Sequence, residues 1–590
     1  MRDLVPLLLL SLPVLNEAHV ALTFPDARFP ALDFLDTSRT SGPCGVPKPR
    51  QPHYTSLAVG STYNITWRMQ YPHQGGYRIS LIDKDGNTVE ELAPINGIEF
   101  AGNEDNLAQS ENVRFTRACS ECTVLLERQA LEWGKSYRFR SCADVNVLET
   151  VPEDDKCSGH GTFVNNRCVC EHGYKGDICQ YRTNCHHDED CLNGGKCVEE
   201  PNSIAAASCY CSYGFFGKNC EQSYEYGDDN CFSYSTINEK SYAMYGMFDP
   251  NCYNKEKLSD NDFVYFRKVK GDVEVIMDYA SSSWISLGWR PEGLDKSCRL
   301  FPDLEGVRNK RSSEVQMPPI IVPPPSRPIH IDTTAEQTET QQREAIFDRD
   351  HPPAKVAQEG PRPVMPRNNG LLDSALRAPL HAMDCIDVVI GAVRDGRTRV
   401  QDSYSRDRST PLEDFWYEGE MSLVAVAGRE LDGRTIVMFR RPIQEIEPTD
   451  HPLGPGRMFV VWAKGQQQDA YAHGAPSALE RSNSKAPFYT DDILKYHGSK
   501  NRGVHPIDFT IPVKLPKPGD VAFGVNIAAA EPAPTQPPPT ATTAKVTSSR
   551  KPAPPTTTTA PPHVYHDVDD SARSSTILLL VLVTAFIVMY

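Results

Sequence analysis

The sequence lacks a sustained basic patch, and it lacks an apolar run long enough to be an unequivocal membrane span. Its formal net charge is −16 over 590 residues. Nucleic-acid binding depends on Lys and Arg side chains gathered on one face. We therefore expect no nucleic-acid binding, and at this length we expect several domains.

The cysteines indicate an oxidising compartment. There are 18 of them, an even number, and most lie before residue 260. Residues 1–18 have the pattern of a signal peptide, with an apolar run at 4–15 and a small residue, Ala18, at the end. In a secretory chain these cysteines predict disulfides rather than zinc ligands. Asn64, in the triplet NIT, is a glycosylation sequon.

The C-terminal residues 571–590 predict attachment to the outer face of a membrane. Residues 577–590 are apolar, but as a helix they would rise only ~21 Å against a hydrocarbon core of ~30 Å. Small residues precede them and no Lys or Arg follows, which indicates a glycosylphosphatidylinositol (GPI) signal. A short transmembrane tail is the alternative. Upstream, residues 531–570 begin with a Pro/Thr-rich tract that is typical of an O-glycosylated stalk.

A second stretch, residues 305–375, is also unsuited to a core. It is rich in Pro, Gln, Arg and Glu with few aromatic residues, which predicts a long disordered insertion. Within it, the basic run that ends at Arg311 resembles a furin-type processing site, and a chance basic cluster is the alternative. A disulfide between Cys298 and Cys385 would hold the two pieces together after cleavage.

Residues 185–220 contain six cysteines with the spacing C-x5-C-x5-C-x11-C-x-C-x8-C. This spacing resembles an epidermal-growth-factor-like (EGF-like) domain, which we place at 181–221. The resemblance implies the disulfides Cys185–Cys197, Cys191–Cys209 and Cys211–Cys220. In so small a domain the crosslinks replace a large core, because they restrict the unfolded chain.

Residues 157–179 resemble the same family, in a degenerate module placed at 153–180. Phe163 stands where the third cysteine belongs, and no first cysteine precedes Cys157 nearby. Those two cysteines pair with each other in the family, so their joint loss leaves Cys157–Cys168 and Cys170–Cys179 able to form. We expect both modules to be rigid spacers, with receptor binding as the alternative.

Residues 19–150 predict an antiparallel β-sandwich. Short alternating strands such as 77–82 (YRISLI) and turn signals such as Asp85-Gly86 favour this fold. Four cysteines predict two disulfides in this domain: Cys44, Cys119, Cys122 and Cys142.

Two histidines carry the candidate chemistry of this domain. Cleavage after Ala18 would give His19 a free amine besides its ring nitrogen, and His73 offers another ring nitrogen. Three nitrogens in a T-shape suit a tetragonal copper ion. The alternative is that His73 is a surface-loop residue and His19 an incidental terminus.

An ordered set of motifs surrounds these histidines: HVALTFP from His19, Pro43-Cys44-Gly45, His73 before Gly75-Gly76, Cys119-x-x-Cys122, and SCADV from Ser141. The set resembles the superfamily of lytic polysaccharide monooxygenases and their non-oxidative, copper-binding relatives. The resemblance implies His19 and His73 as copper ligands. The axial position is open between Phe139, an aromatic residue as in the oxidative members, and Asp144, as in some non-oxidative relatives.

Residues 224–530 predict a second antiparallel sandwich, interrupted by the insertion. Strand patterns recur along this region, at 272–279, 284–289, 421–426, 435–440 and 458–463. Asp432-Gly433 is a two-residue hairpin signal between two of these strands.

Six motifs in this region belong together: WISLGW at 284–289, MDCIDVVIGAVRDG from Met383, Asp402 before Tyr404, AGRELDGRTIVMFRRPI from Ala427, VVWAKG from Val460, and YHGSKNRG from Tyr496. They resemble a DOMON domain, the β-sandwich of secreted cytochromes and of the monooxygenase family that includes dopamine β-hydroxylase.

Haem-binding DOMON domains ligate iron with one Met and one His, and this ligation favours electron transfer because both axial positions are filled. Met383 matches the family's Met, four residues before Asp387, and His497 matches its His near the last predicted strand. His473 is the alternative His. The resemblance implies b-type haem. Some DOMON domains bind none, and Met383 would then be an ordinary core residue.

The sequence thus predicts a mainly β, multidomain, cell-surface glycoprotein. One hypothesis is haem-to-copper electron transfer or oxidative, monooxygenase-like action on extracellular polysaccharide. The other hypotheses are non-enzymatic: adhesion to matrix or cuticle proteins, glycan binding, or surface copper capture. A fold of this kind hosts many functions, so the sites must decide.

Overall fold

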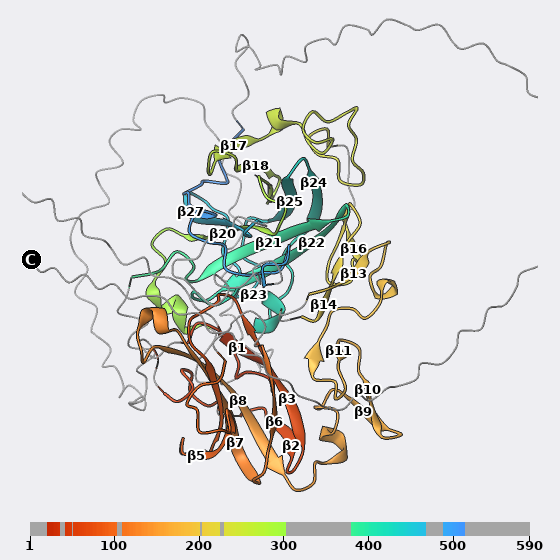
Figure 1. Cartoon of the computed structure of the whole chain (residues 1–590). Helices are drawn as coiled ribbons and strands as arrows, with labels where there is room; N and C mark the ends of the chain where they lie inside the picture. The colour runs from red at the N-terminus through yellow and green to blue at the C-terminus, as the bar shows by residue number, and fades with distance from the viewer. Residues whose placement is uncertain are drawn as a thin grey trace, which may run out of the picture. The chain divides into compact units, whose positions relative to one another are not determined.

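The computed structural model describes residues 20–35, 40, 42–49, 51–102, 109–200, 203, 205–224, 229–301, 379–467 and 488–513. Strands dominate this part of the chain, and its only helices are short 3-10 turns (Figure 1). The predicted mainly β, multidomain class is confirmed.

Several predictions fall on other residues and lie outside the described ones: the signal peptide 1–18, His19, the insertion 305–375 with Arg311, His473, the stalk 531–570 and the tail 571–590. Within the described part of the chain, no helix is long and apolar enough to cross a membrane.

The N-terminal sandwich has a three-stranded and a five-stranded sheet. The smaller sheet has the order β1 (Val20–Phe24), β3 (Thr62–Met69), β6 (Ser110–Arg114). The larger has the order β2 (Thr55–Ala58), β8 (Arg138–Leu148), β7 (Cys119–Gln129), β4 (Tyr77–Ile82), β5 (Thr88–Ala93). Alternate strand residues such as Trp67, Val113 and Leu126 fill the space between them.

This sandwich departs from the prediction in one pairing. β2 runs parallel to β8, with Thr55 opposite Val145, whereas the sequence predicted an antiparallel fold. A tight hairpin forces neighbouring strands to run in opposite directions, but β2 and β8 are joined by a long excursion through other strands. The alternation pattern that predicts a strand says nothing about the direction of such distant partners.

The two disulfide-rich modules follow as a chain of two-stranded ribbons. The first contains β9 (Gly161–Val164), β10 (Arg167–Cys170), β11 (Tyr174–Lys175) and β12 (Tyr181–Arg182). The second contains β13 (Lys196–Glu199), β14 (Ala207–Tyr210), β15 (Phe215–Phe216) and β16 (Gln222–Ser223). Their disulfides join the pairs that the EGF-like resemblance implies.

All 18 cysteines are bonded. The N-terminal sandwich contains Cys44–Cys142 and Cys119–Cys122. The C-terminal region contains Cys231–Cys252 and Cys298–Cys385, and the second of these spans the insertion.

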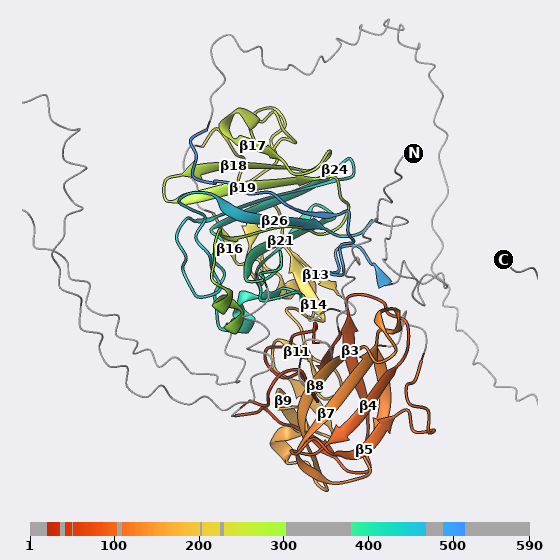
Figure 2. The ribbon, with the colours of Figure 1, turned by 90° about the vertical axis from the view of Figure 1, so that its left-hand side faces the viewer.

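The C-terminal sandwich stacks a five-stranded sheet on a six-stranded one (Figure 2). The five-stranded sheet has the order β17 (Asn254–Lys257), β18 (Phe263–Val269), β19 (Asp272–Tyr279), β25 (Arg434–Pro442), β24 (Ala425–Leu431). The six-stranded sheet has the order β23 (Leu412–Glu413), β22 (Arg397–Ser405), β21 (Ile386–Arg394), β20 (Ile285–Pro291), β26 (Met458–Lys464), β27 (Arg502–Val504). Their core includes Trp289 stacked on Phe439 at 6.0 Å.

The hairpin at Asp432-Gly433 is present: β24 ends at Leu431 and β25 begins at Arg434. Both turn residues have positive φ, 52° and 72°, as a type I′ hairpin turn requires. The strand predicted at 421–426 is misplaced, since β24 covers 425–431. The second half of β24 pairs with β25 along an exposed hairpin and therefore contains polar residues. The apolar pattern in the sequence ends before this half of the strand begins.

Apolar side chains lie on both outer faces of the C-terminal sandwich. Residues 229–253, held by Cys231–Cys252, place Phe232, Phe248 and Tyr253 on the outer face of the five-stranded sheet. On the six-stranded sheet, Ile386, Val388 and Ile390 face outward. Alternate residues of β21 are thus buried on both faces, which explains its nearly continuous apolar sequence.

Candidate functional site

A cavity of about 370 Å³ opens on the outer face of the six-stranded sheet. Its wall is mainly apolar and includes Trp284, Ile386, Val388, Ile390, Val461 and Leu494. The size lies within the range of small-molecule sites, roughly 300–1,000 Å³. The cavity exists because the outward-facing residues of β20, β21 and β26 are apolar but are only partly covered by neighbouring segments.

Met383 and His497, which the sequence nominates as haem ligands, both line this cavity. Met383 lies just before β21, and its amide donates to Nδ1 of His381 at 3.2 Å. His497 is 9% exposed, and its Nδ1 lies 2.8 Å from the carbonyl of Gly498. Donation from Nδ1 to that carbonyl would set the tautomer in which Nε2 carries the lone pair a metal requires.

Cationic side chains also line the cavity, namely Arg408, Lys495 and Arg502. Lys495 is buried, and burial together with the Arg68 cation lowers its pKa to about 7. Its ammonium donates to the carbonyl of Met69 in the N-terminal sandwich. An apolar wall, a Met, a His and several cations suit a flat apolar group with anionic tails, and haem is such a group.

His73 lies after the end of β3 in a tightly folded loop. A Cβ atom on Gly76 would come within 2.3 Å of the carbonyl oxygen of Ala101, so only glycine fits there. Gly75 has φ +105° and leaves equally little room beside Gln129. The two glycines let the loop fold back on β7 and turn the His73 side chain inward, where it is 1% exposed.

Glu132 orients His73. Its carboxylate contacts Nδ1 of His73 and also accepts the amide of Gln74 at 3.0 Å. Burial raises the pKa of Glu132, but the charge and hydrogen bond of His73 outweigh it, and the net pKa is lowered. A carboxylate at Nδ1 fixes the ring and leaves Nε2 as the nitrogen that could bind a metal. The guanidinium of Arg128 donates to the carbonyls of Gly76 and His73, and so holds the backbone of this loop.

Aromatic rings enclose His73. Phe139 stacks on it with ring centroids 5.4 Å apart and planes 19° apart, and Trp133 meets it edge-on at 5.4 Å. Asp144 lies elsewhere: its carboxylate pairs with Arg28 at 2.8 Å and accepts from Thr123. Of the two axial candidates, the structure places Phe139 beside His73 and places Asp144 in an ion pair.

Aromatic rings connect the two candidate sites. The rings of His73 and Tyr71 lie 5.1 Å apart, those of Tyr71 and Tyr496 lie 5.2 Å apart, and those of Tyr496 and His497 lie 5.0 Å apart. The amide of Tyr496 donates to the carbonyl of Gln70 at 3.0 Å, and this hydrogen bond holds the segment of Tyr496 against the N-terminal sandwich. Phe488, from the same segment, packs in the core of that sandwich.

Family models match two parts of the chain. Residues 379–465 match the model of the DOMON domain. This match contains Met383 and strands β21 to β26, and the structure places β20 in the same sheet as β21. Residues 154–182 match a Teneurin-like EGF domain, at the position of the degenerate module.

Curated relatives match over short stretches. They include the mouse (Mus musculus) basement membrane-specific heparan sulfate proteoglycan core protein, 42% identical over 89 residues, and human (Homo sapiens) fibrillin-3, 40% identical over 116 residues. The stretches cover 15% and 18% of this chain. The chain spans only 2% and 4% of the length of these relatives.

Among solved structures, a chitin binding domain from Burkholderia pseudomallei aligns over 22% of this chain and the whole of its own. Its identity is 13% and its TM-score is 0.15, so this likeness carries no argument about function. The EGF-like and DOMON modules, the disulfides and the relatives together describe an extracellular-type protein.

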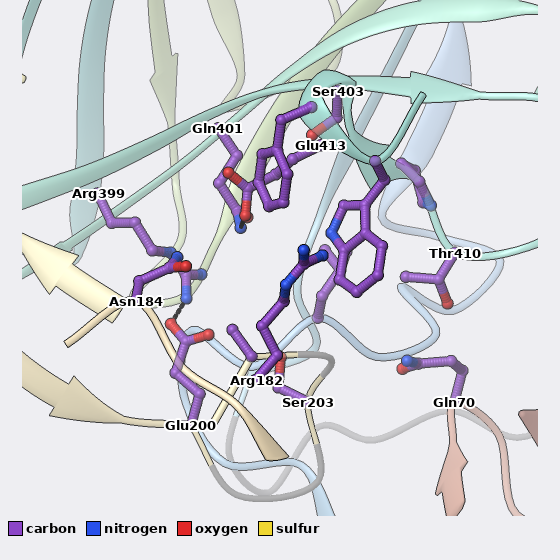
Figure 3. Close-up of a pocket in the computed structure, with 15 residues that line it drawn as sticks. Gln70, Arg182, Asn184, Glu200, Ser203, Arg399, Gln401, Ser403, Thr410 and Glu413 are labelled. Atoms are coloured by element: carbon purple, nitrogen blue, oxygen red, sulfur yellow. Dashed lines mark hydrogen bonds and ion pairs between the residues drawn. The ribbon is translucent and has the colours of Figure 1, made fainter. Parts of the chain in front are cut away.

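The second EGF-like module docks on the C-terminal sandwich around a small polar pocket (Figure 3). We call this sandwich the DOMON sandwich, because its residues 379–465 match the DOMON model. Arg399 forms an ion pair with Glu200, and Gln401 donates to Glu413 at 3.0 Å. The Arg182 guanidinium lies 4.1 Å from the centre of the Trp416 ring. The pocket encloses only about 40 Å³, which suits a few waters rather than a sugar. It is therefore part of a contact between modules.

A larger cleft of about 790 Å³ is lined by Asn64, His53 and Trp416, among others. Asn64 is exposed on β3, so its side chain is accessible in the way that glycosylation requires. Its glycosylation stays a prediction.

Sequence reasoning missed three residues of these sites: Glu132 at His73, and His381 and Arg408 at the DOMON cavity. Glu132 lies 59 residues from His73, and no local pattern signals that the two meet. His381 could have been noticed, because it lies two residues before Met383 in the same motif.

If His73 binds copper, replacing Glu132 by Gln is expected to weaken that binding by about 10–100-fold, because hydrogen-bond partners of metal ligands typically contribute that much. Isothermal titration of the secreted ectodomain with Cu(II) measures the change. The matched control is Glu153→Gln, because the Glu153 side chain is 72% exposed. Equal affinity in the wild type and Glu132→Gln would show that Glu132 does not orient a copper ligand.

Proposed function

We propose that this chain is an extracellular redox protein. In this proposal the DOMON domain holds b-type haem between Met383 and His497, the N-terminal sandwich holds copper at His73 and the mature N-terminus, His19, and the chain couples these two one-electron centres. The observation that carries the proposal is the convergence of Met383 and His497 on one cavity, with the rings of Tyr496 and Tyr71 leading from there to His73.

Bound haem would supply an Fe(III)/Fe(II) couple and bound copper a Cu(II)/Cu(I) couple. The chain's own residues would hold and orient both groups. Glu132 and Phe139 fix the His73 ring, and Arg408 and Arg502 offer positive charge to anionic substituents of haem. Tyr71 and Tyr496, which are both buried and in ring contact, would lie between the two groups.

The burial of His73 favours electron transfer over direct action on polysaccharide. The ring is 1% exposed, and Tyr71 beside it is covered by Tyr496. A polysaccharide chain could reach a ring this deeply buried only if the side chains around it moved. Oxidative action on extracellular polysaccharide therefore requires a further condition that electron transfer does not, namely a movement that exposes His73.

Replacing His73 by Ala is expected to abolish stoichiometric copper binding while the fold is kept, since a metal site that loses one of two histidines loses most of its affinity. The measurement is copper content per chain of the secreted ectodomain after dialysis. His53→Ala is the matched control, because His53 is an exposed histidine of the same sandwich. Unchanged copper content in His73→Ala would refute the copper site.

A second candidate function is non-enzymatic binding to extracellular matrix proteins or glycans. It is supported by the EGF-like modules and by the matrix proteins among the relatives. Membrane attachment through the C-terminal tail fits both functions. An ectodomain that carries neither haem nor copper, yet binds matrix components, would favour this second candidate.

A further inference from the structure

A buried cluster of carboxylates lies inside the DOMON sandwich, away from the haem cavity lining. Asp402, Asp414 and Asp450 each bring one carboxylate oxygen to within 4.8 Å of the others. They are only 3%, 2% and 6% exposed. Asp402 lies on β22, Asp414 begins the 3-10 turn η6 (Asp414–Tyr417), and Asp450 lies in the loop after β25. The fold thus gathers three acids from separate parts of the chain.

The cation beside the cluster, Arg441, already forms ion pairs with Asp387 and Asp450. Arg441, which is fully buried, lies 2.7 Å from Asp387 and 3.1 Å from Asp450. Asp402 accepts the amide of Ser422 at 2.7 Å with one oxygen, and Asp450 accepts the Ser422 hydroxyl at 2.7 Å. Asp387, Asp402 and Asp450 therefore each have at least one stabilising partner, but these carboxylates outnumber the single Arg441 cation.

Asp414 differs from its neighbours. Both of its carboxylate oxygens are buried and accept no hydrogen bond from the described part of the chain. Burial and the charges of Asp402, Asp387, Glu447 and Asp450 all raise its pKa well above the usual range. A buried carboxylate without a partner is costly unless it binds a proton or a cation. Among the described residues, Asp402 also has one oxygen without a hydrogen bond, whereas Asp450 accepts from Ser422 with one oxygen and pairs with Arg441 through the other.

We propose that this cluster binds a divalent cation, Ca²⁺, through Asp402, Asp414 and Asp450. Calcium–oxygen distances of 2.3–2.6 Å place two ligands of one ion at most roughly 5 Å apart, which the cluster satisfies. The donor set consists of carboxylate oxygens, which favour a hard cation over zinc or copper. The ion would neutralise the excess charge and tie η6 and the loop after β25 to β22.

This proposal is independent of haem and copper. It assigns the ion a structural role in the sandwich that supports the cavity wall, since β22 pairs with β21. A chain in which neither redox group binds could still hold calcium. The competing explanation is a proton: Asp414 stays neutral and no ion binds.

The test compares three calcium-depleted ectodomains: wild type, Asp414→Asn and Asp395→Asn. Asp395 is exposed in the turn between β21 and β22 and is the matched control. Equilibrium dialysis against Ca²⁺ measures bound ions per chain, and calorimetry follows the melting of the DOMON sandwich. Asp402→Asn replaces Asp414→Asn if the latter is not secreted.

We expect the wild type and Asp395→Asn to bind one more calcium ion per chain than Asp414→Asn. At 100 times the Kd, calcium should raise the Tm of the wild-type DOMON transition by roughly 5–10 °C. The Tm of Asp414→Asn should not respond. Equal calcium stoichiometry in wild type and Asp414→Asn, or no binding at millimolar Ca²⁺, would overturn the proposal and assign Asp414 a proton instead.

Discussion

Replacement of Arg441 by Met is expected to destabilise the DOMON sandwich by about 3–5 kcal/mol, because the removal of one partner of a buried ion pair leaves uncompensated charge. Arg441 is 0% exposed and pairs with Asp387 and Asp450. Its guanidinium also lies 4.9 Å from the centre of the Trp289 ring, in the middle of the sandwich core. Burial works against the charged form, and the surrounding acids outweigh it and raise the pKa of Arg441, so the side chain stays ionised.

Denaturant unfolding of the ectodomain, followed by tryptophan fluorescence, measures this loss. The matched control is Arg457→Met, because the Arg457 side chain is 64% exposed and lies 3.9 Å from Glu292. Exposed pairs of this kind contribute little, so the control should stay within about 0.5 kcal/mol of the wild type. If Arg441→Met is as stable as Arg457→Met, the buried carboxylates do not depend on Arg441.

Replacement of Met383 or His497 by Ala is expected to remove the haem absorption spectrum or convert it to that of a single-ligand haem. Each side chain would fill one axial position, and loss of either opens the iron to other ligands and lowers affinity. Both residues line the cavity, and neither lies in the core between the two sheets. The fold should therefore survive, with an unchanged far-ultraviolet circular dichroism spectrum.

The control for these variants is Met421→Ala, a methionine of the same sandwich outside the cavity lining. It should keep the full haem content. His381→Ala tests the rival ligand, because His381 lines the same cavity. Haem that is lost in His381→Ala and retained in His497→Ala would move the ligand assignment from His497 to His381.

Much of the fold could be predicted because its signals are local. The period of two in YRISLI predicts β4, whose bounds at 77 and 82 match the structure, and Asp432-Gly433 predicts a hairpin whose two residues both need positive φ. The cysteine spacing of an EGF-like domain is also a local signal, because it is contained in one short stretch of the chain. The parallel pairing of β2 with β8 was missed because it depends on contacts between strands far apart in the chain.

The sites could be predicted only in part, for the same reason. Motif resemblance nominated His73, Met383 and His497, but it could not tell that Glu132 contacts His73 or that Tyr496 lies against Tyr71. The choice between Phe139 and Asp144 depends on which way each side chain of β8 points. Period-two alternation puts the two on opposite faces of the strand, and the face of Phe139 is the one that meets His73.

The buried acids of the DOMON sandwich show most clearly what cannot be predicted from the sequence alone. Asp402, Asp414 and Asp450 stand in three different sequence contexts, and only Asp402 belonged to a motif noticed in the sequence. Acidic residues are usually solvated, so nothing in their local sequence signals burial. Their convergence is a property of the sheet order and of the loops at one end of it.

The most direct test of the central claim is the absorption spectrum of the secreted wild-type ectodomain, recorded before and after dithionite, together with its copper content. We expect the sharp reduced bands of a six-coordinate b-type haem and about one copper per chain. An ectodomain with native disulfides that shows no haem band and no copper would contradict the redox function and leave matrix or glycan binding in its place.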